Sequence, residues 1–288
     1  MLWFVFALAT ALSVAFQDSL AKRLFGGGSP ARMLGFVLLY SLPWVVLGWS
    51  LVERPPLGPE FFWGSALLLP LNGVAMLLYM RAIKLSPLSL TMPILAFSPA
   101  FLIFIGWVVL GEVLSWWGIF GVLVIMSGGY LLHLDRDQTS LWSPFGSLWA
   151  DPGSRAMLGA SLLFAFAAAL GKFSLSHASP LYFAFSFFTV HNLLILIVLR
   201  AFGQISLRDL LSYWKSGVWV GGLYACQVVF HHLAVALTQT AYMISVKRLN
   251  MVFSVGLGRW VFKEENTGQR LLASLLMLAG VAVIYLLG

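Results

Sequence analysis

The chain has 288 residues, of which 60% are hydrophobic and only 9% are charged. Its mean hydropathy of +0.93 exceeds what a water-soluble core needs, which excludes an ordinary soluble protein. The basic residues behind the net charge of +7 are distributed unevenly between the two sides of the predicted spans, so we interpret the charge as membrane topology and expect no nucleic-acid partner. Cys226 is the only cysteine, which excludes an internal disulfide.

Apolar stretches fill almost the whole chain. A membrane-spanning helix needs about 20 predominantly apolar residues. Ten stretches meet this requirement, at residues 2–21, 32–52, 61–83, 88–110, 116–133, 156–175, 181–202, 215–237, 241–262 and 269–287. The sequence therefore predicts an all-α integral membrane protein with ten transmembrane helices in a lipid bilayer.

Two parts of the chain are similar to each other. Residues 85–112 align with residues 237–264 without a gap. The matched pairs are Gly106 with Gly258, Glu112 with Glu264, Gly128 with Gly280 and, nearer the start of each copy, Lys22 with Lys172. We predict two repeats of five helices, over 1–136 and 153–288, with a connecting loop over 137–152. Because five is odd, the second repeat enters the membrane inverted, which is typical of secondary transporters with a central site.

The end of the fourth span carries a recognisable pattern. Gly111-Glu112 is followed by Leu114-Ser115, Gly118, Gly121 and Gly128-Gly129. With five plus five spans, this pattern resembles the EamA-type permeases of the drug/metabolite transporter superfamily over essentially the whole chain. The resemblance implies transport of a small metabolite or drug across a bacterial cytoplasmic membrane. It also implies cytoplasmic termini, whereas the positive-inside rule applied to the basic residues places both termini outside.

Two adjacent basic residues, Lys247 and Arg248, lie within the ninth span. One basic side chain at the centre of a membrane helix costs roughly 3 kcal/mol on insertion scales, so a pair needs a compensating role. An ammonium beside a planar guanidinium suits a bidentate anion, and we predict an anion clamp. The alternative is that both charges brace the bundle.

Ser245-Val246-Lys247-Arg248 is also similar to the phosphate-binding segment of triose-phosphate and related sugar-phosphate translocators. Those translocators carry a further lysine in the fourth span, where this chain has Leu95. One basic cluster in place of two favours a carboxylate or a singly charged phosphate ester over strict phosphate exchange.

Further polar residues lie within the spans. Lys247, Asn250 and Ser254 share one face of a continuous helix at i, i+3 and i+7 spacing. Candidates for the other walls of a central cavity are Tyr224, Gln227, His231, Asn72, Tyr79 and His191. The alternative for each is a hydrogen bond that only packs two helices together.

Three residues are candidates for gating or coupling. Asp18 is the only acid within a span, and we expect it near the membrane surface opposite to Lys247, as a gate or helix-end cap. Pro93 and Pro99 should bend the fourth span, as a hinge or as a static kink.

The sequence favours a transporter over an enzyme. We find no paired carboxylates and no zinc-protease motif, which weighs against a membrane-embedded lipid-modifying enzyme. Adjacent His231 and His232 point about 100° apart on a helix, so we expect no metal and no cofactor. The predicted function is secondary transport of a small organic anion by alternating access, by a monomer or homodimer. The alternative is an exporter of amino acids or other amphipathic metabolites.

Overall fold

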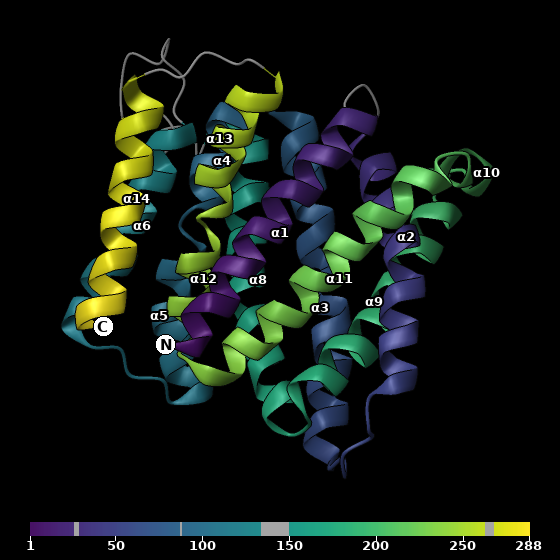
Figure 1. Ribbon diagram of the computed structural model, residues 1–288, viewed down its shortest axis with the longest axis horizontal. Helices are drawn as coiled ribbons and strands as arrows, with labels where there is room; N and C mark the ends of the chain where they lie inside the picture. The colour runs from purple at the N-terminus through teal and green to yellow at the C-terminus, as the bar shows by residue number, and fades with distance from the viewer. Residues whose placement is uncertain (26–28, 87, 134–149, 263–267) are drawn as a thin grey trace.

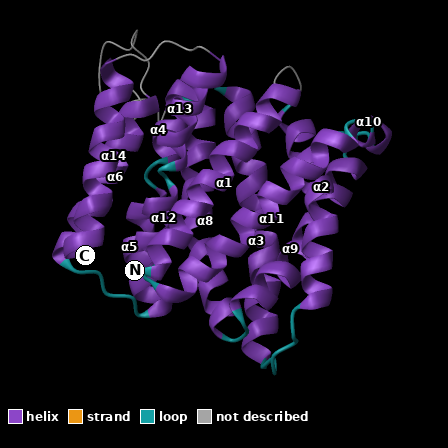
Figure 2. Ribbon diagram, viewed as in Figure 1, coloured by secondary structure: helices purple, strands orange, loops and turns teal. Residues whose placement is uncertain are grey.

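The computed structural model describes residues 1–25, 29–86, 88–133, 150–262 and 268–288 (Figure 1). In this part of the chain, every regular element is a helix and none is a strand (Figure 2). The connecting loop predicted over 137–152 and Glu264 lie largely or wholly outside the described residues. The chain is an all-α membrane protein, as the sequence predicts.

The helices follow one another along the chain. Their bounds are α1 Leu2–Phe25, α2 Pro30–Leu51, α3 Pro59–Leu85, α4 Leu88–Leu95, α5 Ser98–Leu110, α6 Trp116–His133, α8 Pro152–Ser176, α9 Pro180–Ala201, α10 Leu207–Leu211, α11 Trp214–Leu237, α12 Thr240–Lys247, α13 Asn250–Phe262 and α14 Gly268–Leu287. Within the described ranges, eight helical segments are long and apolar enough to cross a bilayer, and α6 is a shorter apolar helix. The total of ten spans stays a prediction.

Polar side chains start several helices within an apolar sequence. Ser29 caps α2, Asp151 caps α8 and Ser179 caps α9, each accepting a hydrogen bond from a backbone N–H three residues on. A proline follows each cap at the first helical position, where its missing N–H costs nothing. These signals fix where each helix enters the membrane region.

Asp151 also joins two helices. The Ser86 hydroxyl, at the end of α3, lies 2.6 and 2.7 Å from the two carboxylate oxygens of Asp151. Burial alone would raise the pKa of Asp151, but hydrogen bonds from Ser86 and Ser154 outweigh it and lower the pKa. The start of α8 therefore lies against the end of α3, and the two helices are antiparallel.

The fourth predicted span is interrupted between Pro93 and Pro99. α4 ends at Leu95, and α5 begins at Ser98 after a turn at Ala96 and Phe97. Pro99 cannot donate a hydrogen bond to the carbonyl four residues earlier, so the helix loosens here. The bend predicted from the two prolines is confirmed.

The ninth predicted span is also interrupted, and the prediction of a continuous helix there is wrong. α12 ends at Lys247, and α13 begins at Asn250. At the junction the Leu249 N–H bonds to the Val246 carbonyl at 3.0 Å, and the Met251 N–H bonds to the Arg248 carbonyl at 3.0 Å. These are the i to i−3 bonds of a tightened turn. The helical face predicted for Lys247, Asn250 and Ser254 therefore does not run through this point.

The helix bounds recur along the chain. Leu88 and Thr240 begin α4 and α12, Ser98 and Asn250 begin α5 and α13, and Trp116 and Gly268 begin α6 and α14; each pair is separated by 152 residues. The two interruptions are therefore at equivalent positions. The helices of the two halves interleave, since α1 packs against α11, α3 against α8, α2 against α9 and α6 against α14.

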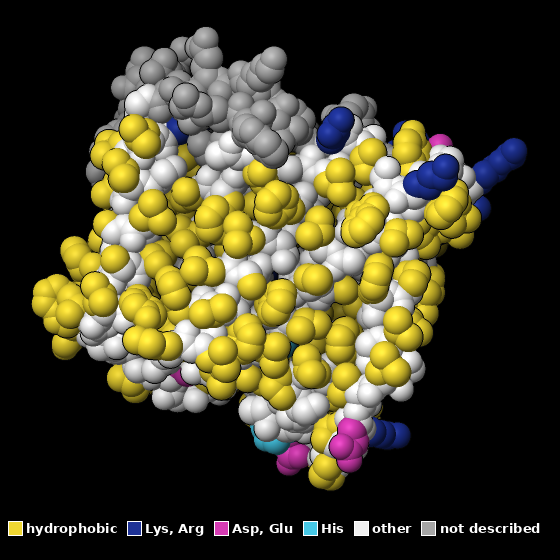
Figure 3. All heavy atoms as spheres, viewed as in Figure 1, with side chains coloured by type: hydrophobic (Ala, Val, Ile, Leu, Met, Phe, Trp, Pro, Cys, Tyr) yellow, Lys and Arg dark blue, Asp and Glu magenta, His cyan; other side chains and the backbone are white. Residues whose placement is uncertain are grey.

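Both chain termini lie at the same end of the bundle, which we call the terminal side (Figure 1). Hydrophobic side chains cover most of the surface between the two ends (Figure 3). The exposed large apolar side chains of the protein include Phe104 at 65%, Trp107 at 57% and Trp219 at 73%. Such a surface needs a lipid environment. Lysine and arginine gather mainly at the end opposite the termini (Figure 3).

Glycines let α6 and α14 approach closely. A Cβ atom at Gly280 would lie 2.7 Å from the Gly121 carbonyl oxygen and 2.8 Å from the Ile125 nitrogen. A Cβ at Gly128 would lie 2.7 Å from the Ala273 carbonyl oxygen. The glycines of these two helices thus serve packing within the chain.

We predict that Gly280→Ala destabilises the protein by about 1–3 kcal/mol, because backbone atoms cannot move aside cheaply. The measurement is the unfolding midpoint in detergent. Gly73→Ala is the control, since a Cβ there would meet nothing within 4 Å. This variant should be neutral or slightly stabilising. Equal effects of the two substitutions would contradict the packing argument.

Candidate functional site

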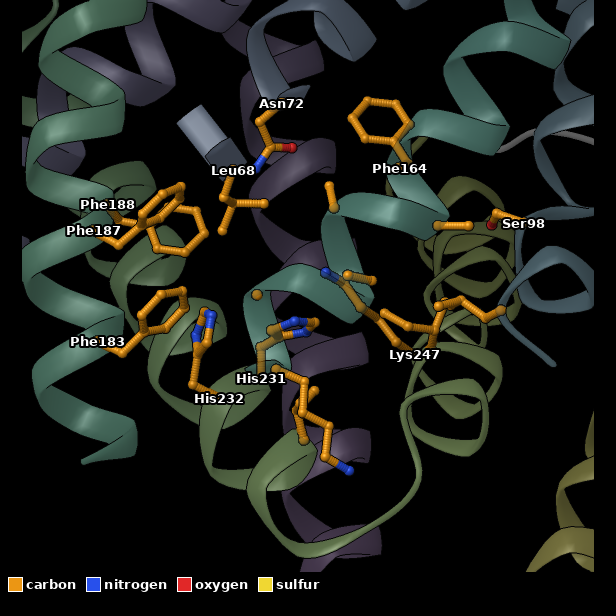
Figure 4. A pocket seen from close by; sticks show the side chains of 18 of the residues that line it. Leu68, Asn72, Ser98, Phe164, Phe183, Phe187, Phe188, His231, His232 and Lys247 are labelled. Carbon is orange, nitrogen blue, oxygen red and sulfur yellow. The ribbon is translucent and has the colours of Figure 1, made fainter. Parts of the chain in front are cut away.

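A cavity of about 310 Å³ lies in the centre of the bundle (Figure 4). Helices from both halves of the chain line it: α3, α4 and α5 from the first half, and α8, α9, α11 and α12 from the second. The polar and aromatic lining residues are Asn72, Ser98, Phe164, Lys172, Phe183, Phe187, Phe188, His231, His232, Lys247 and Arg248. Among the described residues that line it, none is Asp or Glu.

The two helix interruptions meet at this cavity. Arg248 follows the last residue of α12, and its Nη2 donates to the hydroxyl of Ser98, the first residue of α5, at 2.5 Å. The N-terminus of α5 therefore lies beside Arg248. Because helix N-termini carry partial positive charge, α5 adds to the positive potential of the basic pair.

Two polar atoms at the cavity lack partners. Within the described ranges, Arg248 Nε and His231 Nδ1 are buried and have no hydrogen-bond partner. The Lys247 side chain points toward His231 (Figure 4), and the two interact electrostatically. A buried polar atom without a partner is costly, so Arg248 and His231 have hydrogen-bonding capacity that the described part of the protein does not use.

Aromatic rings form another part of the lining. Phe183, Phe187 and Phe188 come from α9 and His232 comes from α11 (Figure 4). Phe183 stacks on Phe187 with ring centroids 5.3 Å apart and planes inclined by 14°. The His232 ring lies 5.3 Å from both Phe183 and Phe188. The cavity thus combines a cationic region and an aromatic surface.

The structure brings several of the predicted site residues together. Lys247, Arg248, His231 and Asn72 all line the cavity. Leu95 lines it too. Asn250, Ser254 and Gln227 are not among the lining residues. The first two belong to α13, beyond the turn that ends α12.

Asp18 and Tyr79 lie near the basic pair without lining the cavity. Asp18 interacts electrostatically with Lys247 and Tyr79, and Tyr79 interacts with Arg248. The predicted separation of Asp18 from Lys247 is therefore wrong. α1 crosses the bundle obliquely (Figure 1), so depth along the helix did not give the position of Asp18 in space. Tyr79 also packs against Phe164, with centroids 6.3 Å apart.

Tyr224 and His191 belong to a separate polar cluster between α2, α9 and α11. Asn192 is fully buried at its centre. It accepts a hydrogen bond from the Tyr224 hydroxyl at 3.1 Å and donates to the Ser41 hydroxyl at 2.9 Å. His191 Nδ1 lies 3.0 Å from the same Asn192 oxygen. This arrangement matches the helix-packing alternative.

Glu112 and Lys172 form a link between the two halves on the terminal side. Lys172 Nζ, at the end of α8, donates to Glu112 Oε1 at 2.5 Å and to the Thr238 carbonyl at 2.6 Å. Glu112, just beyond α5, also accepts from the Thr240 N–H at 2.8 Å and caps the N-terminus of α12. We call these four residues the terminal-side latch. Because Lys172 also lines the cavity, the latch lies directly beside it.

Several residues of the site were missed by sequence analysis. Glu112 and Lys172 had been matched to Glu264 and Lys22 in the repeat, and this recurrence was a usable signal. The sequence carried no comparable signal for Ser98, His232 or the phenylalanines of α9. Apolar residues and single small polar residues are ordinary in a membrane helix.

Comparisons with known proteins agree with the fold. The sequence profile of the EamA-like transporter family matches residues 1–134. One solved structure, described only as a crystal structure of a protein, aligns with 100% of this chain and 98% of its own, with a TM-score of 0.72 and 15% identity. At that identity the similarity shows a shared fold alone. No curated protein matches the chain. Within the described residues, no group of three or more His, Cys, Asp or Glu side chains could hold a metal ion.

We predict that Tyr224→Phe lowers stability by about 0.5–1.5 kcal/mol, because one buried hydrogen bond to Asn192 is lost. Stabilisation by a bound ligand should not change. The measurement is thermal unfolding with and without ligand, and Tyr285→Phe is the control, since Tyr285 is 37% exposed. Loss of the ligand effect with unchanged stability would instead place Tyr224 in the binding site.

Proposed function

We propose that the protein is a secondary transporter that moves a small organic anion by alternating access; the match of residues 1–134 to the EamA-like transporter family supports the transport part of this proposal. The observation that carries the proposal is the pair Lys247 and Arg248 in a central cavity whose described lining contains no carboxylate.

Electrostatics support an anionic substrate. A buried cation is strongly destabilised unless a counter-charge or hydrogen-bond acceptors surround it. Ser98 supplies one acceptor to Arg248, while Arg248 Nε has no protein partner in the described part of the chain. A bound anion would supply the acceptors that the protein does not, and this accounts for two cations beside a cavity.

The position of Leu95 supports a carboxylate over a phosphate. Leu95 lines the cavity where a second basic group would have reached the ligand. One cationic region suits a single negative charge, and a doubly charged phosphate would be left partly unpaired. A zwitterionic amino acid would also need an acceptor for its ammonium group, for which Asn72 offers only an amide oxygen.

Alternating access rests on the repeated architecture. We propose that 1–136 and 153–288 are inverted repeats that rock against each other around the cavity. Paired helix interruptions beside the cavity and a latch between the halves at one end suit such a motion. Asp18 would favour the protonated form of Lys247. Pro93 and Pro99 would keep the fourth span interrupted at the point where it bends. We further propose a bacterial cytoplasmic membrane as the location.

The first test is ligand-induced stabilisation of the purified protein. We expect small carboxylates to raise the unfolding temperature, because they bind only the folded state. At a ligand concentration of 100 times the Kd, the free energy of unfolding should increase by about 2.7 kcal/mol. Lys247→Gln/Arg248→Gln should abolish this effect. Sugar phosphates, zwitterionic amino acids and organic cations complete the panel.

The matched control is Arg81→Gln/Lys84→Gln, which removes two exposed cations at the end of α3 and leaves the cavity intact. It should retain the response to carboxylates. If amino acids or cations stabilise the wild type and the double variant equally, Lys247 and Arg248 brace the bundle and the anion proposal fails.

The terminal-side latch gives a second prediction. Lys172→Gln should shift the population toward a state open on the terminal side, because the ion pair to Glu112 is lost. The measurement uses a Cys226→Ser background in which Asn72→Cys introduces a thiol into the cavity. A membrane-impermeant thiol reagent added on the terminal side should react at least about five-fold faster when Lys172 is replaced than when it is present. Five-fold is the lower end of the usual range of coupling between two sites. An N-terminal tag identifies the vesicles' orientation.

Lys84→Gln is the control for the latch, since Lys84 is exposed near the opposite end of the bundle. It should leave the labelling rate unchanged. An unchanged rate in Lys172→Gln as well would show that the latch does not limit access to the cavity.

A further inference from the structure

We propose that the transported anion is a small aromatic carboxylate, with its carboxylate at Lys247 and Arg248 and its ring against Phe183, Phe187, Phe188 and His232. This inference rests on the proposed function and specifies the substrate class of the same cavity.

The aromatic surface is continuous. Phe187 stacks on Phe183, the Phe183 ring meets His232 at an interplanar angle of 59°, and His232 meets Phe188 at 63°. All four side chains line the cavity. Aromatic rings attract one another in offset or edge-to-face arrangements beyond their burial alone, so a planar ring gains more here than a saturated one.

This surface is held in place before a ligand arrives. Phe183 is 1% exposed and Phe187 is 4% exposed, so neighbouring side chains restrict their rotation. His232 Nδ1 donates to the Val228 carbonyl at 2.7 Å, which fixes the orientation of the imidazole. Because little side-chain entropy is lost on binding, the rings form a preorganised contact surface.

The cationic region lies across the cavity from the rings. Figure 4 shows the three phenylalanines and His232 on one side, Lys247 and Ser98 on the other, and His231 between them. A ligand must therefore carry its charge at one end and its apolar body at the other. The volume of about 310 Å³ lies at the lower end for small-molecule sites, which limits the ligand to a single ring with a short acidic chain.

His231 supplies a further contact between the two regions. The His231 side chain lines the cavity, and its buried Nδ1 has no partner in the described part of the protein. An oxygen of the ligand's carboxylate, or an oxygen on the adjacent carbon, would lie beside the His231 side chain. Phosphates and short aliphatic acids would leave the aromatic surface uncovered.

The test compares ligands that differ only in aromaticity. Calorimetric titration of the full-length protein in detergent would use benzoate against cyclohexanecarboxylate, and 3-phenylpropionate against 3-cyclohexylpropionate, with acetate and phosphate as further ligands. We expect each aromatic acid to bind at least ten-fold tighter than its saturated partner, a difference of about 1.4 kcal/mol.

Substitutions assign the difference to the rings. Phe187→Leu should remove most of the aromatic preference, measured as the ratio of the affinities for each aromatic acid and its saturated partner. Phe188→Leu, at a half-buried position, serves as a second variant if Phe187→Leu does not fold. Phe185→Leu is the matched control, because Phe185 lies on α9 toward Gly48 and away from the cavity lining.

The outcomes separate this inference from the proposed function. Equal affinity for aromatic and saturated acids, with both lost in Lys247→Gln/Arg248→Gln, overturns the aromatic substrate and supports the anion transporter. An aromatic preference that survives in Phe187→Leu and Phe188→Leu also overturns it. Binding of none of the carboxylates to the wild type overturns both proposals.

Discussion

The central constraint on this structure is that two adjacent cations, Lys247 and Arg248, must find hydrogen-bond acceptors within a membrane-spanning bundle. A cation buried away from water requires acceptors, and a continuous α-helix offers few because its own backbone bonds use them. Here α12 ends at the pair, and Arg248 reaches Ser98, the first residue of α5. The contact joins an interrupted helix of one half to an interrupted helix of the other. The cavity, its positive potential and its place between the halves all follow from this meeting of two broken helices.

A set of charged hydrogen bonds joins the two halves beside the cavity. On the terminal side, Lys172, Glu112 and the start of α12 form a compact set of charged hydrogen bonds across the halves. Such bonds are strong where water is scarce, yet a small relative movement breaks them all together. A latch of this kind suits a protein with two alternative arrangements. Its residues recur in the sequence of the other copy, as Lys22 and Glu264.

The cavity lining explains why polar residues in a membrane helix cannot be assigned from spacing alone. Tyr224 and His231 lie on one helix and are both predicted to line the cavity, but Tyr224 donates to Asn192 between packed helices and His231 meets the cavity. Neighbouring helices decide whether a polar side chain finds a protein partner or an open space. The phenylalanines of α9 show the converse, since residues typical of any membrane helix line the site because of where α9 packs.

The sequence by itself determined the membrane class, most of the helix ends and the break in the fourth span, because hydropathy and prolines act through local physics. It also determined that Lys247 and Arg248 needed a compensating role, since the cost of a buried charge is independent of the fold. Only the tertiary structure decided that α12 ends at this pair, that Asp18 lies near Lys247, and that Glu112 meets Lys172. Those contacts depend on helix crossing and on turns without proline or glycine, which leave no local trace in the chain.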